Sequence, residues 1–218
     1  MRDCVFLLAD KNMQATFKGF LTRTRFCRSL GCGEFDFDPC SDLHVAAGDN
    51  DPGLYTRGHE LLRPFRTSHR HAVVVLDAEW NGSPGKDEIA ENITARIAET
   101  GWSRDHFVVI VIAPELENWI WQKNDNVARS LGYSSQDELM ADTDLQEAWP
   151  QGQAKPCLPK EIMELLLRKR RIPRSSSIYQ KISSQISVRN CSDNAFLLLI
   201  NKLRLWFPPS AESQEITL

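Results

Sequence analysis

The sequence lacks several motifs that would assign a function directly. It contains no G-x-S-x-G nucleophile motif and no Walker-type G-x-x-x-x-G-K-[ST] loop. Gly31-Cys-Gly33 is not followed by the third glycine of a dinucleotide-binding fingerprint. These absences argue against oxidoreduction with a nucleotide cofactor.

Long apolar runs are also absent, and no stretch approaches the length that crosses a bilayer. The N-terminal apolar run is too short for a signal peptide and ends at Asp10-Lys11. We therefore expect a cytoplasmic protein with no membrane partner. Its 6 cysteines include Cys27, Cys32 and Cys40, which have no C-x-x-C spacing, so free thiols are expected rather than a zinc site or a disulfide framework.

Charge of one sign is not in large excess. The 218 residues are 42% hydrophobic and 25% charged, with a net charge of -3, as in an ordinary soluble domain. The balance gives no global electrostatic case for nucleic-acid binding, although a local positive cluster can still supply one.

The N-terminal half alternates strand and helix patterns. Short apolar runs at 4–9, His71–Leu76 and Phe107–Ala113 predict buried strands, and alternation at 34–38 predicts a half-exposed one. Helical spacing lies between them, as in 86–100, where isoleucine recurs every four residues. Such alternation predicts an α/β fold with a mostly parallel sheet flanked by helices.

The pattern changes after Gln122, where helical spacing continues and no strand is evident. We therefore expect an α/β core at 1–123, a helical extension packed on it at 124–207, and a flexible tail at 208–218.

Acidic side chains follow each of the three strong strands. Asp10 follows the first, Asp77 and Glu79 end the second, and Glu115 and Glu117 follow the third. If these strands are parallel neighbours, their carboxyl ends meet at one edge of the sheet, which is where open α/β sheets bind ligands. Carboxylate oxygens in this arrangement suit Mg²⁺ or Mn²⁺, which can activate water and stabilise a phosphoryl group during displacement.

Each acid also has a purely structural interpretation. Asp10 can cap the next helix, Asp77 and Glu79 can be solvated turn residues, and Glu115 lies where the helix dipole favours an acid after Pro114, which is expected to start a helix. Glu117 is harder to explain this way, because apolar residues crowd around it.

Basic residues form a second candidate feature. The strongest local cluster contains Arg168, Lys169, Arg170, Arg171 and Arg174. These side chains can contact phosphates without sequence preference, or they can form a solvated helix end. Lys155 and Lys160 could reach the acidic edge, and a histidine among His59, His69 and His71 could serve as a general base.

The layout resembles the TOPRIM fold of topoisomerases, primases and OLD-type nucleases. It is most similar to small TOPRIM-like proteins of bacterial anti-phage systems, the RloB-like group. The residues that carry the resemblance are Asp10-Lys-Asn-Met-Gln14, Asp77-Ala-Glu79-Trp80 and Pro114-Glu-Leu-Glu117-Asn-Trp119. They stand where that group has an E-G-x-T-E-like start, a D-x-D or D-x-E strand end and a P-x-x-E-x-W segment.

The resemblance implies a Mg²⁺- or Mn²⁺-dependent nuclease in phage defence, acting on DNA or RNA together with other defence-system subunits. Asp77, Glu79 and Asp10 would hold the metal, Glu117 would complete the site, and the basic cluster would hold the nucleic acid. The chain departs from the family pattern at Asp10, Lys11 and Gln14, where the family has Glu, Gly and Glu. A second hypothesis is therefore a catalytically degenerate TOPRIM-like scaffold or sensor subunit, and a third is a nucleotide-binding or other small-molecule-binding α/β domain.

Overall fold

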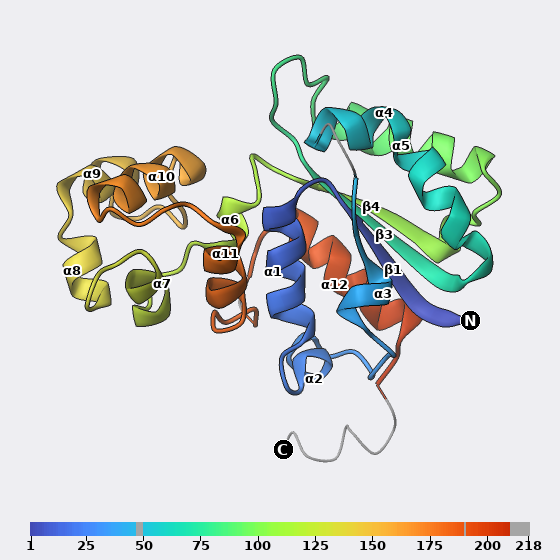
Figure 1. Cartoon of the computed structure of the whole chain (residues 1–218), viewed down its shortest axis with the longest axis horizontal. Coiled ribbons are helices and arrows are strands. Elements are labelled where there is room, and N and C mark those ends of the chain that lie inside the picture. The colour runs from blue at the N-terminus through green and yellow to red at the C-terminus, as the bar shows by residue number, and fades with distance from the viewer. Residues whose placement is uncertain (47–49, 190, 210–218) are drawn as a thin grey trace.

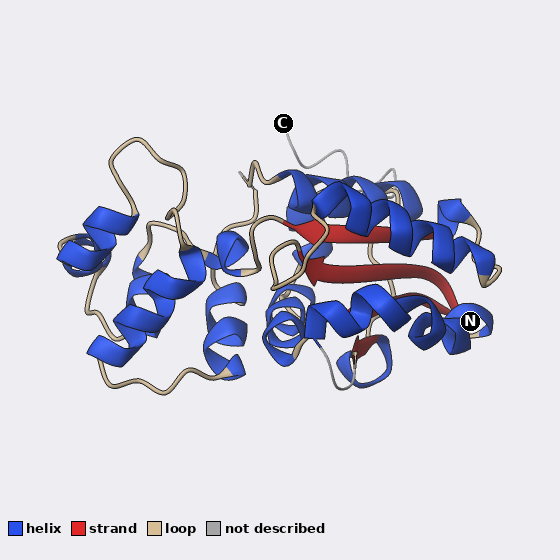
Figure 2. Cartoon of the chain, turned by 90° about the horizontal axis from the view of Figure 1, so that it is seen from above, coloured by secondary structure: helices blue, strands red, loops and turns tan. Residues whose placement is uncertain are grey.

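A four-stranded, all-parallel sheet lies between helices in the right half of Figures 1 and 2. The computed structural model describes residues 1–46, 50–189 and 191–209. The strands are β1 (Arg2–Leu8), β2 (Leu43–Val45), β3 (His69–Asp77) and β4 (Phe107–Ile112). Their order across the sheet is β2-β1-β3-β4. The predicted α/β class, with a mostly parallel sheet flanked by helices, is confirmed.

Strand register aligns the carboxyl ends of the three longer strands. Leu8 pairs with Val75 across β1 and β3, and Asp77 pairs with Ile112 across β3 and β4. The central residues of these strands are apolar and buried, as expected for parallel strands covered on both faces. Side chains that follow these strands therefore emerge at one edge, which we call the carboxyl edge.

Helices cover both faces of the sheet (Figure 2). Helix α1 (Lys11–Leu21) and α12 (Asn194–Trp206) pack on one face and touch through the rings of Phe20 and Phe196. Helices α4 (Asn50–Leu62) and α5 (Lys86–Glu99) pack together on the other. Short elements complete this part: α2 (Phe26–Leu30), α3 (Pro39–Asp42), and the 3-10 turns η1 (Arg63–Thr67) and η2 (Arg104–His106).

A group of helices lies beside the sheet, at the left of Figure 1. It follows α6 (Glu117–Ile120) and contains α7 (Asp125–Ser130), α8 (Gln136–Met140), α9 (Thr143–Ala148), α10 (Pro159–Lys169) and α11 (Ser176–Ser183). Helix α11 packs closely against α1, which joins this group to the sheet layer. Among the described residues no strand follows β4, as predicted.

Two local predictions were wrong. Residues 34–38 form no strand, and the fourth strand is instead β2, which supplies only three residues. Pro114 does not start a helix, because α6 begins at Glu117 with Leu116 at its N-cap.

The predicted flexible tail can be compared only in part, because residues 210–218 lie outside the described residues. No helix in the described part of the chain combines the length and the apolar character that a bilayer crossing needs.

Candidate functional site

The strand order reverses direction between β1 and β3. The chain leaves β1 through α1 on one face and leaves β3 through α5 on the other. In open α/β sheets the crevice at such a switch point, outside the carboxyl ends, is where ligands bind. Asp10 follows β1 and Asp77 ends β3, so these two predicted site residues flank the switch point.

Asp10 is held in place by α1. Its Oδ1 accepts a hydrogen bond of 2.7 Å from the backbone N–H of Met13, which makes Asp10 the N-cap of that helix. The structural interpretation of Asp10 is therefore correct. The cap fixes the carboxylate at the carboxyl edge, so it remains available as a ligand there.

Asp51 is a member of this site that the sequence analysis missed. It lies in the first turn of α4, and its Oδ1 accepts a 2.7 Å hydrogen bond from the backbone N–H of Asp77. Burial raises the pKa of the Asp51 carboxyl, and the negative charge of Asp10 raises it further. The available signal was an acid just before Pro52 that follows β2 in the sequence, but β2 was not recognised as a strand.

Asp77 lies among other acids, and one of its carboxyl oxygens is unpartnered among the described residues. Its Oδ1 is buried and has no hydrogen-bond partner among the described residues. Burial raises the pKa of the Asp77 carboxyl well above its usual value. Neighbouring acids raise that pKa further, in the order Asp51, Glu117, Asp10 and Glu115. A buried carboxyl among other acids must take up a proton or a cation.

Glu115 lies beside the N-terminus of α10. Its Oε1 accepts a 2.9 Å hydrogen bond from the backbone N–H of Lys160, and the Lys160 Nζ lies 3.8 Å from Oε2. Burial, with a further contribution from Glu117, raises the pKa of Glu115 to about 7. Lys160 thus reaches the acidic edge as predicted, whereas the ammonium of Lys155 donates to the carbonyl of Trp121 instead.

Glu117 is buried, with 3% of its side chain exposed, and its charge is compensated. Its Oε1 accepts hydrogen bonds from the Tyr179 hydroxyl and, at 3.2 Å, from Arg174 Nη2. Arg174 also pairs with Glu164. These bonds give Glu117 a structural role that joins α6 to α11, in addition to its electrostatic effect on Asp77.

Glu79 is placed differently from Asp77. It is exposed and lines a hollow of about 430 Å³. The other lining residues are Trp80, Glu115, Lys160, Glu161 and Glu164. The structure thus groups Asp10, Asp51 and Asp77 at the switch point and places Glu79 on an acidic rim beside it.

The donor atoms fit a divalent cation in chemical type, because all are carboxylate oxygens. Their positions do not form a ready coordination shell. Within residues 1–46, 50–189 and 191–209, no group of three or more His, Cys, Asp or Glu side chains stands where it could hold a metal ion. A cation bound here would require side-chain rearrangement around Asp77.

Most residues of the predicted basic cluster are engaged within the protein. Lys169 pairs with Asp142 at 2.9 Å and with Asp144 at 2.7 Å. Arg170 pairs with Glu138 and lies over the Tyr133 ring, and Arg174 turns inward to Glu117. Arg168 and Arg171 are exposed.

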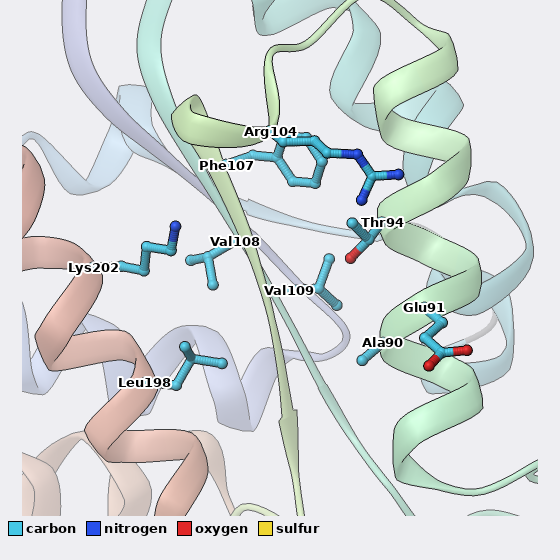
Figure 3. A pocket seen from close by; sticks show the side chains of 9 residues that line it. All are labelled: Ala90, Glu91, Thr94, Arg104, Phe107, Val108, Val109, Leu198 and Lys202. Carbon is cyan, nitrogen blue, oxygen red and sulfur yellow. The ribbon is translucent and has the colours of Figure 1, made fainter.

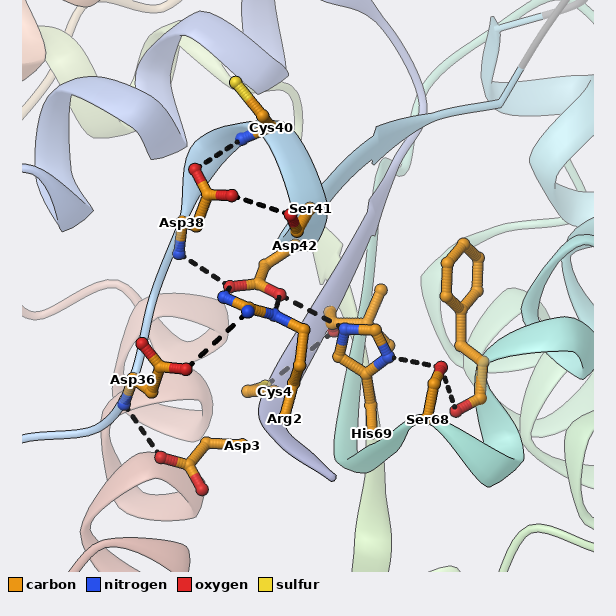
Figure 4. Close-up of polar contacts among 12 residues, drawn as sticks. Arg2, Asp3, Cys4, Asp36, Asp38, Cys40, Ser41, Asp42, Ser68 and His69 are labelled. Atoms are coloured by element: carbon orange, nitrogen blue, oxygen red, sulfur yellow. Dashed lines mark hydrogen bonds and ion pairs between the residues drawn. The ribbon is translucent and has the colours of Figure 1, made fainter.

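Two of the histidines lie at the opposite edge of the sheet, within the first residues of β3. Figure 4 shows His69 between Ser68 and Asp42, at 2.9 and 3.1 Å. Asp42 is fully buried, and Arg2 forms two hydrogen bonds with its carboxylate. This network links β1 to β3. His69 and Asp77 lie at opposite ends of β3, so His69 is not part of the acidic edge.

Comparison with protein-family models, curated proteins and solved structures found no match to this chain.

Proposed function

We propose that the carboxyl edge binds a divalent cation, Mg²⁺ or Mn²⁺, through Asp77 with Asp10 and Asp51, and that the protein cleaves nucleic-acid phosphodiester bonds there. The observation that carries the proposal is the buried Asp77 Oδ1, which has no hydrogen-bond partner among the described residues. Four neighbouring carboxylates raise the pKa of Asp77 further: those of Asp51, Glu117, Asp10 and Glu115.

Several carboxylates close to one buried carboxyl repel one another, and the Asp77 Oδ1 has no hydrogen-bond donor among the described residues. A divalent ion would replace the proton that Asp77 otherwise holds, and hard oxygen donors are the ligands that Mg²⁺ and Mn²⁺ prefer. When bound, such an ion activates water and offsets charge that develops on a phosphoryl group.

The chain's own residues suit the remaining tasks. Glu115, with a pKa of about 7, can accept or donate a proton near neutral pH. Lys160 lies beside it and can contact a phosphate oxygen. Exposed Arg168 and Arg171 are available to the nucleic-acid backbone, and Lys169, Arg170 and Arg174 would have to exchange an internal partner for a phosphate. The proposed setting, defence against phage with partner subunits, rests on the motif resemblance alone.

Calorimetric titration with Mg²⁺ and Mn²⁺ tests the cation site. We expect binding by the wild type, loss of binding in Asp77→Asn, and unchanged binding in Asp137→Asn, which neutralises an exposed acid on α8. Incubation with single- and double-stranded DNA and RNA plus Mn²⁺ then tests cleavage. No binding by the wild type, or equal binding by Asp77→Asn, would contradict the proposal.

A specific observation favours a second function, a catalytically inactive scaffold or sensor. No preformed metal-ligand group exists among the described residues, and Glu117 is already neutralised by Arg174 and Tyr179. In this case Asp77 stays protonated, neither metal binds, and no nucleic acid is cleaved. The same titration therefore separates the two functions.

A further inference from the structure

A groove runs along the outer edge of β4 (Figure 3). It has a volume of about 530 Å³ and is bounded by α5 on one side and α12 on the other. Its lining residues are Ala90, Glu91 and Thr94 of α5, Arg104 of η2, Phe107, Val108 and Val109 of β4, and Leu198 and Lys202 of α12. None of them belongs to the acidic carboxyl edge.

The strand at the base of this groove is an unpaired sheet edge. Among the described residues β4 pairs only with β3, so its outer backbone groups have no strand partner. The groove reaches this edge along residues 107–109, whereas residues 110–112 are only 0–3% exposed. An unpaired edge can add a further strand there through main-chain hydrogen bonds. Parallel sheets of this order commonly continue with a fifth strand at this position.

Two side chains of opposite charge lie at different points along the groove. Arg104 lies at the start of β4 beside Phe107, and Glu91 lies farther along, beyond Val109 (Figure 3). Both side chains are exposed and lie on the α5 side of the strand. Neither has an ion-pair partner among the described residues. On the α5 side, the groove therefore carries a positive charge at one end and a negative charge at the other.

This pattern is self-complementary in one geometry. When two copies of β4 pair antiparallel about a twofold axis perpendicular to the sheet, the start of one strand lies beside the end of the other. Arg104 of each copy then faces Glu91 of its partner, and this contact occurs twice, as in any symmetric dimer interface. Leu198, 43% exposed on the α12 side, is shielded from water by the same pairing.

We propose that the β4 groove is occupied by the β4 strand of a second copy of this chain, so that two sheets join into one of eight strands. This proposal does not depend on the cation site. It assigns Glu91 and Arg104 the role of fixing the antiparallel register, because a parallel or shifted pairing would lose both Arg104–Glu91 contacts.

Sedimentation velocity over a range of concentrations tests the proposal on the full chain. The wild type is expected to dimerise. Glu91→Arg places arginine opposite Arg104 twice, and Arg104→Glu places glutamate opposite Glu91 twice, so each variant should weaken the dimer by roughly tenfold or more. The double variant Glu91→Arg/Arg104→Glu exchanges both charges and should restore dimerisation.

Glu99→Arg is the matched control, because Glu99 is also exposed on α5 but does not line the groove. It should leave the dimer unchanged. Amide hydrogen exchange gives an independent readout: protection of residues 107–109 should increase with protein concentration. A wild type that stays monomeric, a double variant that stays dissociated, or a control as disruptive as Glu91→Arg would each overturn the proposal. Capture of an acidic peptide by a monomeric protein would do the same.

Discussion

Asp77 and Glu117 are carboxylates of one edge with opposite solutions to burial. Glu117 accepts hydrogen bonds from Arg174 and Tyr179, which compensate its charge. Asp77 has an Oδ1 without any partner among the described residues, and the Asp77 pKa is raised. Since both share the sheet edge, the difference is local: Glu117 has hydrogen-bond partners, whereas the Asp77 Oδ1 has none among the described residues. Such unsatisfied groups concentrate at functional sites.

The compensation of Glu117 leads to a prediction about Arg174. We expect Arg174→Leu to lower the free energy of unfolding by about 2–3 kcal/mol, because it leaves a buried carboxylate without its charge partner and the partial exposure of the arginine limits the loss. Urea unfolding followed by circular dichroism measures the change.

Arg129→Leu is the control for that variant. Its guanidinium also pairs with an acid, Asp125, but both side chains are exposed, and such pairs contribute at most about 1 kcal/mol. Equal destabilisation by the two substitutions would show that Glu117 does not depend on Arg174.

At the scale of elements, the three strands of six residues or more were predictable from the sequence, and the shortest strand was not. Strands β1, β3 and β4 and helix α5 were predicted because their periodicity extends over six residues or more. Strand β2 has only three residues, and pairing with β1 rather than its own sequence defines it. Because β2 was not predicted, Asp51 was not recognised as a site residue. Its role depends on the hydrogen bond that it accepts from the backbone N–H of Asp77 at the sheet edge.

The same limit applies to side-chain direction. Asp77 and Glu79 are two residues apart, which predicts a shared face only while the strand continues. The strand ends at Asp77, so Glu79 follows the turn outward and becomes exposed. Pairing of Arg174 with Glu117, over 57 positions, depends on how α11 docks and has no sequence signal.

The contact between α1 and α11 leads to a second prediction, at Gly19. A Cβ there would lie 2.0 Å from Ser183 Oγ and 2.6 Å from the Gln180 carbonyl oxygen. We expect Gly19→Ala to destabilise the protein by about 1–3 kcal/mol, since the helices must separate and overpacking outweighs the helix propensity of alanine. Thermal unfolding measures this change.

Gly58→Ala in α4 is the matched control. Gly58 is also buried within a helix, but the nearest atom to its added Cβ is the flexible Leu54 Cδ1 at 3.1 Å. It should be neutral or slightly stabilising. Destabilisation of Gly58→Ala as large as that of Gly19→Ala would mean that helix packing at α1 and α11 is not the cause.

At the scale of the whole molecule, the two ends of the sheet respond to pH in opposite directions. At the carboxyl edge, burial raises the pKa of Glu115 to about 7. At the amino edge, burial lowers the pKa of His71 to about 4, and this ring stacks on Trp206 with centroids 4.5 Å apart. The fold favours the neutral form of both groups, one an acid and the other a base.

The direction of each pH dependence follows from the difference in proton binding between the folded and unfolded states. The folded state holds the Glu115 proton more tightly than the unfolded chain, so its contribution to stability is present below about pH 4.5 and is lost as pH rises through 7. The unfolded chain binds a proton at His71 more tightly, so that contribution is present above about pH 6.5 and is lost as pH falls through 4.

The final prediction compares Glu115→Gln and His71→Phe with the wild type in EDTA between pH 4 and 8. The stability of Glu115→Gln relative to the wild type should increase as pH rises, because the variant has no proton to lose. The relative stability of His71→Phe should increase as pH falls, since phenylalanine keeps the stack and takes up no proton. Denaturant midpoints at each pH give both curves. Two curves with slopes of the same sign would contradict the assignment of opposite pH dependences to Glu115 and His71. Opposite slopes would assign the loss of stability at alkaline pH to the acidic edge. A cation bound at that edge should then reverse this loss.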